Sequence, residues 1–372
     1  MFLKKMGQVL AGAGAAVLSA GLGPACSSNG TAPSPAARAA AGNMTLMEIA
    51  QNKLHHRPGG FVNLFSDQEY RDLSRFLKWK LFSENKFKKF YSEEKTIPVQ
   101  KDWGPVHRHQ GLSVTFVKHA SLLVRDQGRT VLIDPVFGNI FPLFHDFSPL
   151  SFDLAAMPEP DLALITHGHY DHLDVDSLKS LPASTRVITP LGHDEVFSDI
   201  PLKRTKLDWF ESFQGAGYDI ILAPANHWTM RNPLTGPNTS LWGAYIVKTP
   251  SGRTLFFSGD SAYFSGFAEL GRLFDFDLAV FNLGAYEPRW FMKNHHLDPA
   301  EAVKSFRELG ARLMTAVHWG AYRLGDEPVH FPPRELRREM IRAGLEDRLV
   351  DLAPGETLFF EADGAVPGVP CI

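Results

Sequence analysis

The stretch from Thr166 to Asp174 constrains this chain more than any other. It reads Thr-His-Gly-His-Tyr-Asp-His-Leu-Asp and directly follows an apolar run, Leu162 to Ile165, with the composition of a buried strand. A turn this dense at the end of a strand directs its side chains into a common space instead of alternating them across a sheet. Imidazole and carboxylate groups suit zinc or a related first-row ion. The turn contains enough candidate ligands to contribute to two metal sites. They are His167, His169, Asp171 and His172.

More candidate ligands stand just beyond the ends of later strand-like runs. They are His227 after residues 220–223, Asp260 after residues 254–257 and His318 after residues 314–317. Binding residues of α/β proteins concentrate at such strand ends. One histidine in this position is more often a packed or capping residue than a ligand, and a histidine-rich turn alone can be a polar loop. The coincidence of all these positions favours a metal site.

From Leu112 onward, strand-like and helix-like patterns alternate, which predicts an α/β domain. One predicted helix starts at Asp298-Pro299-Ala300-Glu301, a cap with a reciprocal glutamate, and stops at Gly310. A second runs from about Pro333 to Ala343, before Gly344. The predicted strands are residues 113–117, 121–125, 130–133, 163–165, 186–189, 220–223, 243–248, 254–257, 278–281 and 314–317.

Residues 1–26 have the features of an export signal. Two lysines precede the small, apolar stretch Val9–Leu22, which has the length of a signal peptide and is short for a membrane span. The stretch ends Leu22-Gly23-Pro24-Ala25-Cys26, which resembles a bacterial lipobox, although the large apolar residue stands one position too early. Two interpretations remain open. Lipidation at Cys26 would give a membrane-anchored lipoprotein, and ordinary cleavage would give a periplasmic protein.

The next segments differ in composition from the main domain. Residues 27–42 are rich in Ser, Pro, Ala and Gly, which is typical of a flexible tether. Residues 43–105 are expected to form an N-terminal helical extension, with a capping box at Ser66–Glu69 followed by apolar residues at helical spacing. Aromatic and lysine residues interleave over Lys86–Tyr91, which suits a membrane surface, but a helix packed on the main domain is the commoner role of such a stripe. The main domain is expected over residues 106–363, with a tail at 364–372.

Composition narrows the function classes. The formal net charge is −3 and no long basic stretch accompanies the candidate ligands, so nucleic acid is not an expected partner. The chain has two cysteines, Cys26 and Cys371, near its opposite ends. They cannot form a C-x-x-C zinc site, and the core needs no disulfide.

The ligand order H-x-H-x-D-H, then His, Asp and His, resembles that of the metallo-β-lactamase superfamily, over roughly Leu112 to Phe360. The resemblance implies an αββα sandwich with a site for two zinc ions at one edge of its sheets. His167, His169 and His227 would hold one ion. Asp171, His172 and His318 would hold the other, with Asp260 as the bridge. Asp171 and Asp260 would also serve catalysis, and Asp134, in Leu-Ile-Asp-Pro, would orient a ligand histidine.

A narrower resemblance rests on longer motifs. Gly284-Ala285-Tyr286-Glu287-Pro288-Arg289-Trp290-Phe291-Met292 and His296-Leu297-Asp298-Pro299 are similar to the phospholipase D family that hydrolyses N-acylphosphatidylethanolamine. So are Ser240–Gly243 and His318–Gly320. The resemblance places Tyr286, Arg289 and His296 near the substrate, although Arg289 could equally stack on its neighbours and His296 could be structural. The chain departs from the family at Lys118, where glycine is usual, and in the loop 137–157.

This resemblance implies attack of a metal-activated hydroxide on a phosphodiester, yielding an N-acylethanolamine and phosphatidic acid. A membrane surface would then be a partner, and the apolar loop from Phe141 to Leu150 would either dip into lipid or fold onto the core. Two other classes remain open. A small polar pocket would favour a hydrolase of a soluble lactone or phosphoester on the same fold, and missing ligands would favour a non-enzymatic metal- or lipid-binding lipoprotein.

Overall fold

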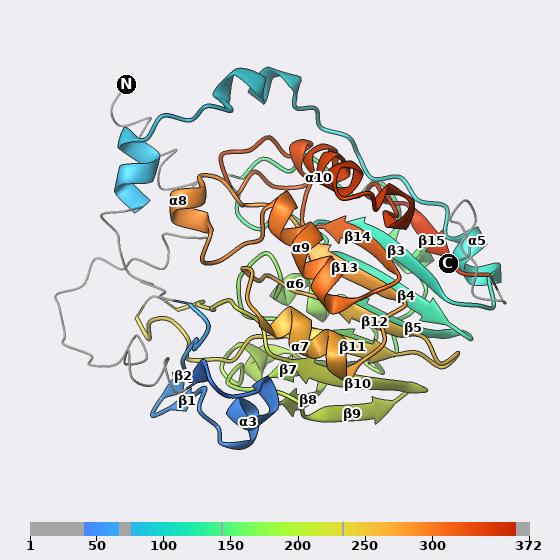
Figure 1. The fold of residues 1–372 in the computed structure, drawn as a ribbon. Helices are drawn as coiled ribbons and strands as arrows, with labels where there is room; N and C mark the ends of the chain where they lie inside the picture. The colour runs from blue at the N-terminus through green and yellow to red at the C-terminus, as the bar shows by residue number, and fades with distance from the viewer. Residues whose placement is uncertain (1–40, 67–75, 143, 233, 362–372) are drawn as a thin grey trace.

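Two β-sheets stacked on each other form the centre of the molecule, and helices cover both outer faces (Figure 1). The computed structural model describes residues 41–66, 76–142, 144–232 and 234–361. The first sheet has the order β15-β3-β4-β5-β6-β7-β8 and the second has the order β14-β13-β12-β11-β10-β9. This arrangement is the αββα sandwich expected from the sequence.

Each sheet contains both parallel and antiparallel neighbours. In the first sheet, β5 to β8 run parallel and the other pairs are antiparallel. Its strands are β3 (Ser113–Lys118), β4 (Ser121–Asp126), β5 (Arg129–Ile133), β6 (Leu162–Leu164), β7 (Arg186–Pro190), β8 (Lys203–Leu207) and β15 (Thr357–Phe359). In the second sheet, β12 to β14 run parallel. Its strands are β9 (Ser212–Gly215), β10 (Tyr218–Ala223), β11 (Ala244–Lys248), β12 (Thr254–Phe257), β13 (Leu278–Asn282) and β14 (Leu313–Val317).

Side chains alternate in direction along the strands of the first sheet, so the apolar ones form two separate layers, one on each face. On β4, Leu122 and Val124 face the core between the sheets, whereas Leu123 faces the outer layer. The outer layer packs on α5 (Gly104–Arg108) and α6 (Val175–Lys179) through Val106 and Leu178. Because both faces are covered, the strands are apolar on both sides and appear in the sequence as continuous apolar runs.

Three helices contribute apolar residues to the core of the second sheet, namely α7 (Gly266–Leu273), α9 (Pro299–Leu309) and α10 (Phe331–Arg342). Helix α9 confirms the predicted start, because Asp298 and Glu301 form the reciprocal capping box, and Gly310 ends it with a φ of 72°. Helix α10 begins two residues before the predicted Pro333. Two prolines fit its first turn, where no backbone N–H donor is needed.

The described part of the N-terminal extension is made of short elements. These are α3 (Leu46–Gln51), β1 (His56–Arg57), β2 (Gly60–Phe61), η1 (Lys78–Phe82) and η2 (Lys88–Glu93). The Trp79 indole donates to Asp326 at 2.9 Å, and the rings of Phe87 and Phe90 pack on Phe331. Residues 79–90 of the extension therefore pack along the segment that leads into α10, whereas His55 and Asn63 bond to Asp208 and Asn226 on another part of the molecule (Figure 1). The remaining short elements are η3 (Leu154–Ala156), η4 (Val196–Asp199), α8 (Arg289–Met292) and η5 (Glu346–Arg348).

Several sequence predictions fall on residues outside this description. They are the export signal with Cys26, most of the tether, the last three residues of the predicted capping box Ser66–Glu69, and the tail at 364–372. Among the described residues, no helix has both the length and the apolar character to cross a membrane.

Two buried tyrosines connect the sheets by hydrogen bonds at different places. The Tyr245 hydroxyl on β11 lies 2.9 Å from the carbonyl oxygen of Ile165 and 3.2 Å from that of Ile188, both in the first sheet. The Tyr218 hydroxyl on β10 donates to the carbonyl oxygen of Arg129 at 3.0 Å. Only the Tyr245 bond lies beside the histidine turn, because Ile165 directly precedes Thr166.

We expect Tyr245→Phe to lower the free energy of unfolding by about 1–3 kcal/mol, because a buried carbonyl loses its donor. We also expect it to weaken metal binding, since the freed carbonyl lies next to the histidine turn. Tyr218→Phe is the matched control, with a similar loss of stability and unchanged metal binding. Chemical denaturation and metal titration of both variants measure this. Equal metal binding by the two variants would show that the Tyr245 bond does not position the turn.

Candidate metal centre

All of the predicted ligands come together at one edge of the sandwich. His167, His169, Asp171 and His172 follow β6, whereas His227, Asp260 and His318 follow strands of the second sheet. Together with His119, which was not predicted, they form two groups, and within each group the ligand atoms lie within 4.8 Å of one another. The first ligand group is His167, His169, His227 and Asp260, and the second ligand group is His119, Asp171, His172 and His318.

In the first ligand group, imidazole nitrogens face one another at close range. His169 Nδ1 lies 2.9 Å from His167 Nε2 and 3.3 Å from His227 Nε2. Asp260 Oδ2 completes the group at 3.8 Å from the Nε2 atoms of both His167 and His227. Three rings and a carboxylate therefore surround one small volume.

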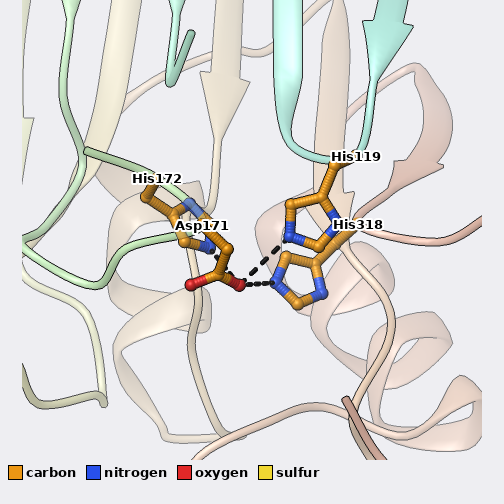
Figure 2. A group of neighbouring side chains, drawn as sticks. All are labelled: His119, Asp171, His172 and His318. Carbon is orange, nitrogen blue, oxygen red and sulfur yellow. Dashed lines mark hydrogen bonds and ion pairs between the residues drawn. The ribbon is translucent and has the colours of Figure 1, made fainter. Parts of the chain in front are cut away.

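In the second ligand group, three imidazoles surround one carboxylate oxygen, as Figure 2 shows. Asp171 Oδ2 lies 3.1 Å from His119 Nε2, 3.4 Å from His318 Nε2 and 3.6 Å from His172 Nε2. These residues are buried, and they come from the ends of β3, β6 and β14.

Asp260 lies between the two ligand groups. Its Oδ2 atom is 3.3 Å from His172 Nε2 and its Oδ1 atom is 3.3 Å from His318 Nε2, in addition to the contacts with the first ligand group. The Asn282 amide donates to Oδ1 at 3.0 Å. Burial alone would raise the pKa of Asp260, but the imidazoles of His172 and His318 hold it well below the usual value. This geometry suits a carboxylate shared by two cations.

The donor set fits metal binding. Burial lowers the pKa of His169 to about 4 and holds the pKa values of His167 and His227 well below their usual value, so these imidazoles are neutral. The Nε2 atoms of His169, His172 and His318 are buried without a hydrogen-bond partner. Burial disfavours charge on His172 and His318, but the carboxylates of Asp260 and Asp171 raise the pKa of His172 well above its usual value and that of His318 to about 9. The centre therefore favours positive charge beside its carboxylates, which a bound cation would supply in place of these protons. Nitrogen and carboxylate ligands of this kind suit zinc.

Asp134 holds the histidine turn from behind. Its carboxylate accepts hydrogen bonds from the Thr166 backbone N–H at 2.7 Å and the Thr166 hydroxyl at 2.6 Å. It also lies 2.8 Å from His172 Nδ1, on the side of the ring away from the second ligand group's carboxylate. A carboxylate can only accept, so His172 Nδ1 carries the proton and Nε2 presents its lone pair to the site.

The three residues expected to lie near the substrate have different surroundings. His296 Nδ1 lies 3.8 Å from Asp260 Oδ2, at the edge of both ligand groups. Tyr286 is buried, and its hydroxyl has no hydrogen-bond partner among the described residues. The Arg289 guanidinium lies 2.7 Å from Glu301 and 3.3 Å from Asp298, and it also donates to the carbonyl oxygen of His296 at 2.9 Å. In this structure Arg289 therefore supports the loop that carries His296.

His119 was not among the ligands predicted from the sequence. It follows the predicted strand 113–117, so the same criterion that found His318 could have found it. The short hairpin between β3 and β4 hid this signal, because a polar residue in such a turn is ordinary. The neighbouring Lys118 is also buried, and its ammonium binds Asp146 and the carbonyl oxygen of Gly138.

We expect Asp134→Asn to weaken metal binding by roughly 10–100-fold, the usual effect of removing a carboxylate behind a ligand histidine. An asparagine amide can donate to His172 Nδ1 and so favour the wrong tautomer. Competition with a chromophoric chelator measures the affinity, and circular dichroism checks the fold. A correctly folded variant with unchanged metal affinity would contradict the orienting role of Asp134.

Comparisons with known proteins agree with this geometry. Residues 129–319 match the family model described as the beta-lactamase superfamily domain. N-acyl-phosphatidylethanolamine-hydrolyzing phospholipase D 1 of Caenorhabditis elegans is 30% identical over 316 residues, which cover 79% of this chain and 88% of that protein. A metal-dependent hydrolase of Nitratidesulfovibrio vulgaris is 27% identical over 251 residues, covering 66% of this chain and 94% of that protein. The crystal structure of isothiocyanate hydrolase from Delia radicum gut bacteria is similar with a TM-score of 0.55 at 18% identity, covering 67% of this chain and 100% of that chain.

The structural likeness shows the sandwich fold, and the family model covers the strands that carry most of the ligands. The relative from Caenorhabditis elegans extends the similarity to most of the chain. We conclude that the chain belongs to the metallo-β-lactamase superfamily and is a metal-dependent hydrolase of that fold.

Proposed function

We propose that this chain is a phosphodiesterase of phospholipase D type that hydrolyses N-acylphosphatidylethanolamine-like phospholipids. The observation that carries the proposal is its 30% identity, over 79% of the chain, to an enzyme named for that reaction. The Gly284–Met292 motif supports it, because this segment leads to His296 at the edge of the ligand groups. The expected products are an N-acylethanolamine and phosphatidic acid.

Two divalent ions, held by the two ligand groups, would make a water strongly nucleophilic at neutral pH and neutralise charge on the phosphoryl oxygens. The residues of the chain supply the rest. Asp260 is ionised and can orient the attacking water by accepting its hydrogen bond. In the overall reaction the water oxygen bonds to phosphorus, the bond from phosphorus to the ethanolamine oxygen breaks, and that oxygen takes up a proton.

His296 is suited to contact the phosphate. Burial lowers its pKa to about 4, so the imidazole is neutral and can donate one hydrogen bond. Its side chain is partly exposed, whereas the side chains of His167 and His227 are almost completely buried. A substrate phosphate that reaches the two ligand groups would therefore meet His296 at the entrance.

We expect zinc-loaded protein to release N-acylethanolamine and phosphatidic acid from N-acylphosphatidylethanolamine micelles, detected by mass spectrometry. Asp260→Asn should lose most of this activity, because the carboxylate between the ligand groups loses its charge. Asp176→Asn, an exposed acid on α6, is the control and should retain it.

Metal analysis of the same samples separates the possible results. A protein that carries two equivalents of metal and does not release either product would contradict the lipid substrate. Hydrolysis of a soluble lactone or phosphoester by that protein would then favour the alternative, a soluble-substrate hydrolase on the same fold.

We further propose that the N-terminal extension contacts an anionic membrane surface. Leu81, Phe82 and Ile97 are 48%, 80% and 67% exposed, which is unusual for apolar side chains of this size. Exposed lysines surround them in the sequence, at positions 78, 86, 88 and 89. Apolar and basic residues together favour the headgroup region of an anionic bilayer. A lipid anchor at Cys26, proposed from the sequence, would act in the same direction.

We expect the double variant Leu81→Ser, Phe82→Ser to bind anionic vesicles more weakly, because apolar surface available to the bilayer is lost. Cosedimentation with vesicles that contain phosphatidylserine measures this. Leu273→Ser on α7 is the matched control, since Leu273 is 48% exposed but lies on a different element. If both variants bind like the unchanged protein, the extension is not the membrane contact.

A further inference from the structure

His119 occupies a position that the proposed reaction does not require. It lies in the hairpin between β3 and β4 and is completely buried. Its Nε2 atom is 3.1 Å from Asp171 Oδ2, within hydrogen-bond distance (Figure 2). His318 and His172 approach the same oxygen at 3.4 Å and 3.6 Å. His119 thus makes the shortest of the three imidazole contacts with Asp171.

The backbone of His119 also joins the two sheets. Its carbonyl oxygen accepts a hydrogen bond from the His318 N–H at 2.7 Å, and His119 forms an isolated antiparallel bridge with Trp319. The rings of His119 and His318 are 4.1 Å apart. One residue of the first sheet therefore contacts both Asp171 and His318, which arise from different sheets.

Both partners in this contact have an unusual backbone. His119 has a φ of 52° and His318 a φ of 71°, in the left-handed region that side chains rarely adopt. Such conformations persist where the surrounding structure enforces them, and they concentrate at functional sites. A turn without a function at this place would tolerate glycine or asparagine at lower cost.

A hydrogen bond from His119 to Asp171 is the positioning alternative to direct metal coordination, which would need the lone pair of the same nitrogen. An ionised carboxylate can only accept, so the His119 nitrogen that faces Asp171 must carry the proton. That nitrogen then has no lone pair for a metal. His172 shows the opposite arrangement, because its Nδ1 atom faces Asp134 at 2.8 Å and its Nε2 atom is left for the site.

We propose that His119 is a positioning residue for the second ligand group. Its N–H fixes the Asp171 carboxylate, and its carbonyl oxygen and ring fix His318, so that both present their lone pairs to one cation. The inference rests on the metal centre of the proposed function but not on the lipid substrate. It predicts that loss of His119 weakens metal binding by the second ligand group and leaves the first ligand group nearly unchanged.

The test is a metal titration of His119→Ala, His119→Gln and the unchanged protein against a chromophoric chelator. We expect His119→Ala to bind one equivalent normally and the second roughly 10–100-fold more weakly, as for other residues that orient a metal ligand. His119→Gln should recover most of the affinity, because the glutamine amide can donate to Asp171. His107→Gln is the control, since His107 is an exposed histidine on α5 whose ring contacts the carbonyl oxygen of Ala156 and neither ligand group.

Cobalt-substituted protein supplies a second readout. In a positioning role, His119→Gln keeps the number of nitrogen ligands, so the visible spectrum of the cobalt form should match that of the unchanged protein. Loss of the second equivalent in both variants, with a changed cobalt spectrum, would overturn the proposal in favour of direct coordination. An unchanged second affinity in folded His119→Ala would overturn it in favour of a purely structural turn. Neither readout involves the substrate, so failure of the lipid proposal would be seen separately.

Discussion

The concentration of lone pairs at one edge of the sandwich is the constraint on which the rest of the structure depends. The described ligand groups bring imidazole nitrogens and carboxylate oxygens to within 4.8 Å of one another in a buried place. On burial these groups lose their hydrogen bonds to water, and without a cation they gain too few hydrogen-bond donors in exchange. The packed sheets, the Asp134 contacts and the Tyr245 bond hold this arrangement, and a bound metal would supply the missing interaction.

Several residues of the site also have a strained backbone conformation, which the surrounding sheets must stabilise. Asp134 has a positive φ of 42°, as His119 and His318 also have positive φ values. Gly284 shows how tightly the neighbouring segments fit, because a Cβ at this position would lie 2.3 Å from the His318 carbonyl oxygen. The glycine that opens the Gly284–Met292 motif is therefore required by the backbone of a candidate ligand. This contact gives a physical reason for the motif that does not depend on substrate.

The sequence was most informative where chemistry and burial coincide. The expected αββα sandwich is confirmed, and the strands that lead into the candidate ligands were found because their apolar runs end in His or Asp. Strands β8 and β9 were missed, since they are partly exposed and carry Lys, Arg, Ser and Gln in place of an apolar run. Strand β15 was missed because it is only three residues long. His119 was missed for a different reason. Its role depends on a contact between hairpin and sheet that no local pattern encodes.

A similar distinction separates the metal centre from the loop beside it. The ligand groups depend on strand ends that the family model covers, so they follow from the fold. The loop that begins at Phe137 is instead held by Lys118, the position where the resemblance to the phospholipase D family leads one to expect glycine. Burial of the Lys118 ammonium is costly and lowers its pKa, and the ion pair with Asp146 offsets that cost. Because Lys118 also holds the Gly138 carbonyl oxygen and directly precedes His119, it fixes this loop to the second ligand group. The loop that begins at Phe137 is therefore held by a contact of this chain's own, beside a metal centre built on the common fold.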